Sequence, residues 1–255
     1  MPPPRAGLFV TCLVDLMRPS VGFAAARLIE ASGCTVVVPE RQTCCGQPAY
    51  NSGDRDTARS IALQTVRAFA DCDYVVVPSG SCAAMLKVHY PRLVAGDELE
   101  SEVRTFASKV HELCTFLADV RRYTNVPGRY EGRVTYHDAC SGLRELGVKS
   151  APRRLLGNVP GLELAEMREA EACCGFGGLF AEKYAGISNA IVTRKADDAT
   201  ASGASLMLAG DLGCLMNIAG KLTREGRQLT CRHVAEVLAG ELSDPPIGHG
   251  KVASP

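Results

Sequence analysis

Two Cys-Cys-Gly segments constrain this chain more than any other feature of its sequence. Cys44-Cys45-Gly46 lies in the first half, and Cys173-Cys174-Gly175 lies in the second. Neighbouring cysteines make a poor disulfide with each other, because their Cα atoms sit about 3.8 Å apart and a bridge prefers roughly 5.5 Å. They can instead hold two metal ions or two atoms of one cluster. The glycine that follows allows positive φ and a close approach of the backbone to a bulky inorganic group.

Each Cys-Cys-Gly segment is flanked by further cysteines in the same order. Cys12 precedes the first segment and Cys82 follows it, while Cys140 precedes the second and Cys214 follows it. The pattern Cys, Cys-Cys-Gly, Cys therefore occurs twice. This internal repeat predicts two similar halves related by pseudo-twofold symmetry.

The composition favours a globular protein with reduced cysteines. The chain of 255 residues is 46% hydrophobic and 22% charged, and its 28 Lys and Arg equal its 28 Asp and Glu, which argues against a nucleic-acid-binding surface. The sequence contains no apolar stretch of about 18 residues that would predict a transmembrane segment. We expect a cytoplasmic protein, in which cysteines serve more often as metal ligands or core residues than as disulfides. Four of the 12 lie outside the repeat and are predicted to be core residues: Cys34, Cys72, Cys114 and Cys231.

Predicted strands alternate with predicted helices along the chain. Short apolar runs predict strands at 8–11, 34–38, 74–77, 134–137, 162–165 and 205–208. Helices are predicted at 21–31, 100–121, 183–199 and 233–242. Two more are predicted to begin after an N-cap at Asp54 and after a turn at 210–214. This order predicts an α/β fold of two pseudo-symmetric Rossmann-like βαβ halves with mainly parallel sheets. We expect the halves at 1–122 and 133–242, a linker at 123–132 and a disordered tail at 243–255.

Every repeat cysteine is predicted to lie just after the carboxyl end of a strand. In open α/β sheets this edge is where ligands bind, so each half can bring four thiolates to a common crevice. Four thiolates satisfy either an iron-sulfur cluster or a zinc ion, and one half can differ from the other. Ligand type alone does not separate these alternatives.

Several segments around the repeat cysteines are similar to one known family. They are Phe9-Val10-Thr11-Cys12, Cys44-Cys45-Gly46-Gln47-Pro48-Ala49, Ser79-Gly80-Ser81-Cys82, Tyr136-His137-Asp138-Ala139-Cys140, Cys173-Cys174-Gly175-Phe176-Gly177-Gly178 and Cys214-Leu215-Met216-Asn217-Ile218-Ala219-Gly220. The chain resembles the cysteine-rich CCG-domain family, to which heterodisulfide reductase and parts of the iron-sulfur subunits of glycolate oxidase and anaerobic glycerol-3-phosphate dehydrogenase belong. The similarity extends from about Leu8 to Leu242.

The resemblance is strongest to lactate-utilization members of this family, and it implies a function. It implies an oxidoreductase subunit that relays electrons through [4Fe-4S] clusters, one or two, with zinc as the alternative in one half. It further implies two partner proteins, one of which would bind the hydroxy acid, in the oxidation of L-lactate to pyruvate. The implied ligands are Cys12, Cys44, Cys45 and Cys82 for one centre and Cys140, Cys173, Cys174 and Cys214 for the other. The alternatives are a thiol-disulfide reductase of the heterodisulfide type and a non-catalytic zinc-binding scaffold.

This sequence departs from the fullest family pattern at two positions. That pattern ends each half in Cys-x-x-Cys, but Ser79 and Asp211 occupy the first of those positions here. Four thiolates per half favour an ordinary [4Fe-4S] centre, for which four suffice. Asp211 is a further iron ligand or a helix N-cap.

Other residues near the cysteines are expected to support the site or to pack. Gly46 and Gly175 are expected to bring backbone close to the metal centre, with amides that point at sulfur. His137 either donates a hydrogen bond or proton to the centre or packs at the end of its strand. Three arginines have two possible roles: they bind a substrate carboxylate through bidentate contacts, or they form a solvated helix face. They are Arg144, Arg153 and Arg154.

Overall fold

The protein folds into two parallel β-sheets of four strands each, in a computed structural model that describes residues 2–249. The first sheet has the order β2-β1-β3-β4, with β1 at Arg5–Leu8, β2 at Thr35–Val37, β3 at Tyr74–Val77 and β4 at Val110–Glu112. The second has the order β6-β5-β7-β8, with β5 at Gly132–His137, β6 at Leu162–Leu164, β7 at Leu206–Ala209 and β8 at Thr230–His233. The identical order confirms the predicted pair of Rossmann-like halves.

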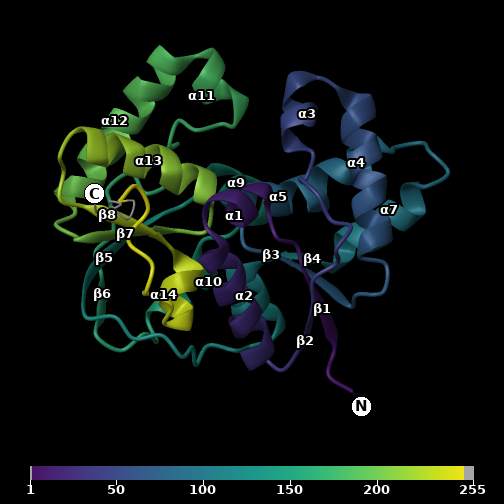
Figure 1. Ribbon diagram of the computed structural model, residues 1–255, viewed down its shortest axis with the longest axis horizontal. Helices are drawn as coiled ribbons and strands as arrows, with labels where there is room; N and C mark the ends of the chain where they lie inside the picture. Colours follow the sequence, from purple (N-terminus) through teal and green to yellow (C-terminus); the bar gives the residue numbers. More distant parts are fainter. Residues whose placement is uncertain (1, 250–255) are drawn as a thin grey trace, which may run out of the picture.

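Helices connect the strands and surround both sheets (Figure 1). In the first half they are α1 (Cys12–Met17), α2 (Pro19–Ala31), α3 (Gln47–Ser52), α4 (Arg55–Ala68), α5 (Gly80–Ala84), α6 (Tyr90–Leu93), α7 (Glu100–Lys109) and α8 (Leu113–Thr115), with π-helical turns at η1 (Met85–His89) and η2 (Phe116–Val120). In the second half they are α9 (Cys140–Leu146), α10 (Ser150–Leu156), α11 (Leu179–Lys183), α12 (Ala185–Ala201), α13 (Leu212–Arg224) and α14 (Val234–Ala239). Asp54 is the N-cap of α4, as predicted, and accepts a hydrogen bond from the Thr57 amide at 3.1 Å.

The first sheet separates two apolar cores. On β3, Val76 points to the core shared with the second half, whereas Val75 and Val77 point to a core beneath α4, α6 and α7. This alternation follows from the two-residue period of a strand that is buried on both faces. The shared core also contains residues of α2 and α14, and these helices lie between the two sheets in Figure 1. Ion pairing reinforces their contact, since Arg18 contacts the buried carboxylate of Glu236 at 2.8 Å.

Two strands were not predicted from the sequence. The helix predicted at 100–121 ends at Lys109, and β4 follows it. β8 lies at 230–233, and only its last residue, His233, overlaps the helix predicted at 233–242. Both are the fourth strand of their sheet and pair with one neighbour only, β4 with β3 and β8 with β7. An edge strand of three or four residues carries too few side chains to show its own period.

The end of the chain, where we predicted disorder from residue 243, packs on β8 as far as the structure describes it. Ile247 pairs with Cys231 through an isolated bridge and is buried. Arg18 donates a hydrogen bond to the carbonyl of Pro245 at 2.7 Å, and Arg232 donates to the carbonyl of Asp244 at 2.6 Å. Hydrogen bonds to backbone carbonyls and one buried apolar side chain therefore hold this segment against the fold. The proline and glycine content from which we predicted disorder does not indicate these contacts. Residues 250–255 lie outside the described residues.

The two halves also meet where α5 crosses α9, near the centre of Figure 1. A Cβ atom added at Gly80 would lie 2.9 Å from the Cα of Gly142, and one at Gly142 would lie 3.3 Å from the Cα of Gly80. The Gly80 amide also donates to the carbonyl of Gly210 in the other half at 3.2 Å. Glycine is required here because the two backbones touch.

Gly80→Ala is expected to lower the free energy of unfolding by about 1–3 kcal/mol, the usual range for overpacking against backbone that cannot move away. Urea denaturation of the metal-free chain measures this change. Gly186→Ala is the matched control, because a Cβ there meets nothing within 4 Å in helix α12. That control is expected to gain up to about 1 kcal/mol from helix propensity. A Gly80→Ala protein as stable as the control would contradict this account of the crossing.

Candidate metal centre

The first group of four cysteines gathers at the carboxyl ends of β1, β2 and β3. Cys12 is the first residue of α1, Cys44 and Cys45 lie in the loop before α3, and Cys82 lies in α5. We call these four residues the first quartet. Cys45 and Cys82 are buried, whereas Cys12 and Cys44 are half-buried. The Sγ atoms of Cys12 and Cys44 lie 3.9 Å apart.

The thiols of the first quartet interact as a chain. Cys44 interacts with Cys12 and Cys45, and Cys45 also interacts with Cys82. The Cys12 and Cys45 thiols, helped by the Gly46 amide, lower the pKa of Cys44 to about 2, while the bond to Cys44 and burial raise the pKa of Cys12 and of Cys45. One thiolate is thus stabilised by its neighbours, and a positive charge beside Cys12 and Cys45 would favour their ionisation. A bound cation supplies that charge.

The second quartet, Cys140, Cys173, Cys174 and Cys214, repeats this arrangement at the ends of β5, β6 and β7. Cys140 is the first residue of α9, Cys214 lies in α13, and the pair precedes α11. Cys174 and Cys214 are buried, and Cys140 and Cys173 are half-buried. Bonds from Cys140 and Cys174 lower the pKa of Cys173 to about 2, which matches the position of Cys44. The structure therefore brings together all eight cysteines in the two sets of four that the sequence suggested.

The glycine of each Cys-Cys-Gly segment brings the backbone against sulfur. Gly46 and Gly175 have φ of 79° and 82°, and the Gly175 amide donates to the Sγ of Cys173 at 3.3 Å. A Cβ at Gly175 would lie 2.7 Å from the carbonyl oxygen of Ser188. Only glycine combines this φ with this contact.

Side chains that the sequence analysis did not identify hold the two Cys-Cys loops. The Tyr90 hydroxyl donates to the carbonyl of Cys45 at 3.0 Å, and the Asn217 amide donates to the carbonyl of Cys174 at 2.9 Å. Ser188 donates to the carbonyl of Gly175 at 2.8 Å. These residues are distant in sequence from the loops they hold, and no motif singles out Tyr90 or Ser188.

Two buried basic side chains distinguish the second quartet from the first. His137 ends β5 and is fully buried, and burial together with nearby Lys195 lowers its pKa to about 3. The Lys195 ammonium donates to the carbonyl oxygens of Glu169 and Ala170, and burial lowers its pKa. A neutral imidazole and a buried lysine therefore lie near the second group of sulfur atoms.

Asp211 connects the two halves. Its Oδ2 accepts hydrogen bonds from the Ser79 hydroxyl and from the Ser81 amide, both at 3.0 Å. Asp211 makes no side-chain bond to its own helix, so it caps α5 of the other half rather than α13. The two positions at which this sequence departs from Cys-x-x-Cys thus bind each other at the junction of the halves.

Two of the three arginine candidates, Arg153 and Arg154, are engaged in ion pairs, whereas Arg144 makes no such pair among residues 2–249. Arg153 makes a bidentate pair with Asp138, at 2.8 and 2.9 Å, and also contacts Glu166. Arg154 pairs with Asp119. These contacts favour the structural interpretation of Arg153 and Arg154 over a role in substrate binding.

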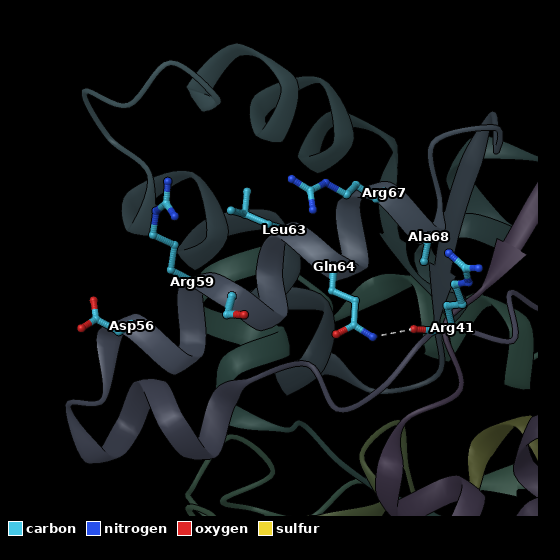
Figure 2. A pocket seen from close by; sticks show the side chains of 8 residues that line it. Arg41, Asp56, Arg59, Leu63, Gln64, Arg67 and Ala68 are labelled. Carbon is cyan, nitrogen blue, oxygen red and sulfur yellow. Dashed lines mark hydrogen bonds between the residues drawn. The ribbon is translucent and has the colours of Figure 1, made fainter.

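Two cavities differ in whether they reach the cysteines. One lies between the halves, has a volume of about 330 Å³, and is lined by Tyr50 and His89 on one side and by Cys140, Cys173, Cys174 and Cys214 on the other. The other, of about 650 Å³, lies along α4 and is lined by Arg41, Asp56, Arg59 and Arg67 (Figure 2). The second is lined by no cysteine, whereas the cavity between the halves reaches the second quartet.

The donor sets fit a metal or an iron-sulfur cluster. All 12 cysteines lie within the described residues and are free thiols. A ring nitrogen of His137 and the sulfur atoms of Cys174 and Cys214 lie within 4.8 Å of one another, and neither ring nitrogen of His137 has a hydrogen-bond partner among residues 2–249. Buried, unpaired donors around a common point are costly unless a cation binds them. Among residues 2–249 the structure shows no helix of the length and apolar character needed to cross a bilayer.

Comparisons with known proteins agree with this site. The family model "CCG: Cysteine-rich domain" matches residues 6–87 and 134–219, one segment in each half. Lactate utilization protein A of Geobacillus kaustophilus (strain HTA426) is 49% identical over 235 residues, which cover 92% of this chain and 98% of that protein. The protein of the same name from Geobacillus thermodenitrificans (strain NG80-2) is 48% identical over the same coverage.

A solved structure supports the fold. The crystal structure of a hypothetical protein from Helicobacter pylori superimposes with a TM-score of 0.66 and covers 96% of this chain and 50% of that one. The sequence identity is 9%, so this similarity concerns the fold alone. The family model and the identity to relatives covered over 98% of their length show that the chain belongs to the lactate utilization protein A family of CCG cysteine-rich domain proteins.

Proposed function

We propose that this protein is an iron-sulfur electron-transfer subunit of a system that oxidises L-lactate to pyruvate. The observation that carries the proposal is the pair of matching quartets, each gathered at the carboxyl edge of its own parallel sheet. The substrate is inferred from the name of the relatives, which are 43–49% identical across nearly the whole chain.

The chain's own residues would hold and tune two centres. The quartets supply four thiolates each, the number that a [4Fe-4S] cluster requires, and such a cluster supplies one-electron chemistry when bound. The Gly175 amide, which donates to Cys173, stabilises negative charge on that sulfur. Oxidation of lactate to pyruvate releases two electrons and two protons, and two one-electron centres match that number of electrons.

Other components of the system would complete the reaction. We place the lactate site on one of two partner proteins, because Arg153 and Arg154, two of the three arginine candidates, are paired with acidic residues of this chain. The free thiols also fit a reducing compartment, so we assign the activity to the cytoplasm.

Complementation tests the lactate role. A Geobacillus kaustophilus strain without its own lactate utilization protein A would receive this chain, and growth on L-lactate as carbon source would be measured. Restored growth that is lost in Cys45→Ser and Cys174→Ser strains is the expected result. If the expressed, metal-loaded chain does not restore growth, the assignment to lactate oxidation is overturned.

The cavity between the halves favours a second candidate, a thiol-disulfide reductase. This cavity is lined by the second quartet, of which Cys140 and Cys173 are half-buried, and cleavage of a disulfide substrate requires an accessible thiol. The discriminating assay is reduction of a mixed disulfide by the reduced, metal-loaded chain. Turnover would favour the reductase, and its absence alongside lactate-dependent reduction would favour the electron-transfer subunit.

A further inference from the structure

One nitrogen donor lies inside the second quartet. A ring nitrogen of His137 and the Sγ atoms of Cys174 and Cys214 all lie within 4.8 Å of one another, and all three side chains are buried. The sequence suggested a hydrogen bond or packing for His137. The distances are instead those of donors that need only small side-chain rotations to contact one ion, since metal–nitrogen and metal–sulfur bonds measure about 2.0–2.3 Å.

The hydrogen-bond environment of His137 leaves the ring available. Neither of its nitrogens has a partner among the described residues, although the side chain is fully buried. The Ala170 carbonyl lies near the ring, yet the geometry falls short of a hydrogen bond. A metal-bound histidine usually donates its other N–H to such a carbonyl, which fixes the ring. A merely packed histidine would leave two polar atoms uncompensated in the core, at a substantial cost.

The first half has no such donor, because Phe9 occupies the matching position. Phe9 lies three residues before Cys12, just as His137 lies three residues before Cys140. The strand registers agree, since Leu8 pairs with Val76 in the first sheet and Tyr136 pairs with Leu208 in the second. The duplicated fold therefore places an apolar ring at one centre and an imidazole at the other.

We propose that His137 is a metal ligand, and that its ring nitrogen binds one metal ion of the second centre together with the thiolates of Cys174 and Cys214. The ion is iron or zinc, since imidazole and thiolate suit both. The inference rests on the proposed function in taking the quartets to be metal centres. It departs from that function in one respect, because an ion bound by two thiolates and an imidazole differs from an iron of a [4Fe-4S] cluster, which binds one protein ligand. It makes the two centres unequal, with sulfur donors alone in the first half and mixed nitrogen and sulfur donors in the second.

X-ray absorption of the second centre alone tests the proposal. The double variant Cys44→Ser/Cys45→Ser is expected to empty the first quartet, so that the metal remaining in the anaerobically reconstituted full chain belongs to the second. Spectra at the iron and zinc edges identify the ion and the atoms bound to it. The expected result is a nitrogen neighbour with imidazole scattering at one of these edges.

Two histidine variants on the same background provide the controls. His137→Phe installs the residue found in the first half and is expected to remove the nitrogen signal. His111→Phe is the matched control, because His111 lies in β4, against Tyr74 and Phe116, and should leave the signal intact. If His137→Phe does not fold, the spectrum of the double variant that retains His137 still shows whether an imidazole nitrogen binds the metal of the second centre.

The outcomes separate this inference from the proposed function. A second centre with sulfur neighbours only, or a nitrogen signal that persists in His137→Phe, overturns the role of His137 and leaves the proposed function standing. Metal in the first half of the wild-type chain with none in the second also overturns it. Absence of metal from both halves of the wild-type chain overturns the proposed function as well.

Discussion

Cys45→Ser is expected to abolish the metal centre of the first half and to leave the centre of the second half intact. Cys45 lies in the middle of its thiol chain and is buried, so no solvent ligand can readily replace it. Cys174→Ser is the equivalent change in the second half. Each variant should retain roughly half the metal of the wild-type chain, because a structural site with three thiolates binds far more weakly than one with four.

Metal and sulfide analysis with EPR of the reduced protein measures this effect. Cys34→Ala is the matched control, because Cys34 is a buried cysteine outside both quartets and packs in the apolar core. It is expected to keep both centres. Loss of both centres from a single quartet substitution would mean that the halves share one site, contrary to the separate gathering of each quartet.

Asp211→Ala is expected to loosen the junction between the halves. The substitution removes the acceptor of two hydrogen bonds and leaves the Ser79 hydroxyl and the Ser81 amide without it in a buried environment. Hydrogen bonds to a charged group contribute about 1.5–3 kcal/mol each, so the free energy of unfolding should fall by at least about 2 kcal/mol. Urea denaturation of the metal-free chain provides the measurement.

A second variant and a second measurement serve as controls for Asp211→Ala. Ser79→Ala removes one of the two donors and should cost about 1 kcal/mol. Metal content per folded chain should be unchanged in Asp211→Ala, because the Oδ2 atom is held by the hydroxyl of Ser79 and the amide of Ser81 in the first half. Unchanged stability combined with loss of metal would show that Asp211 is a ligand instead.

The sequence predicted the parts of the fold that have a strong local signal. Tyr74–Val77 is a strand of apolar and β-branched residues, and Leu162–Leu164 alternates apolar and charged residues; their predicted positions agree with the structure to within a residue. β4 was missed because Val110 also fits the spacing of an amphipathic helix, and β8 was missed because Thr230–His233 contains no apolar run. Their strand character depends on pairing with β3 and β7, which no local pattern encodes.

The site residues differ in the same way, since some have a local sequence signal and others act only through tertiary contacts. The cysteines were identifiable because metal ligation demands one residue type at repeated spacings. Tyr90, Ser188 and Lys195 contribute through contacts made only after the chain has folded, and each residue type has many other uses in sequence. The bond between Asp211 and Ser79 was also not predictable, since each residue alone resembles an ordinary helix cap.

The central claim is that each quartet binds a redox-active inorganic group. Anaerobic purification followed by iron, acid-labile sulfide and zinc analysis, with EPR after reduction, tests it most directly. We expect iron and sulfide in comparable amounts and a reducible EPR signal. A colourless chain that contains no iron or sulfide after reconstitution, or that carries zinc in both quartets, would contradict the account.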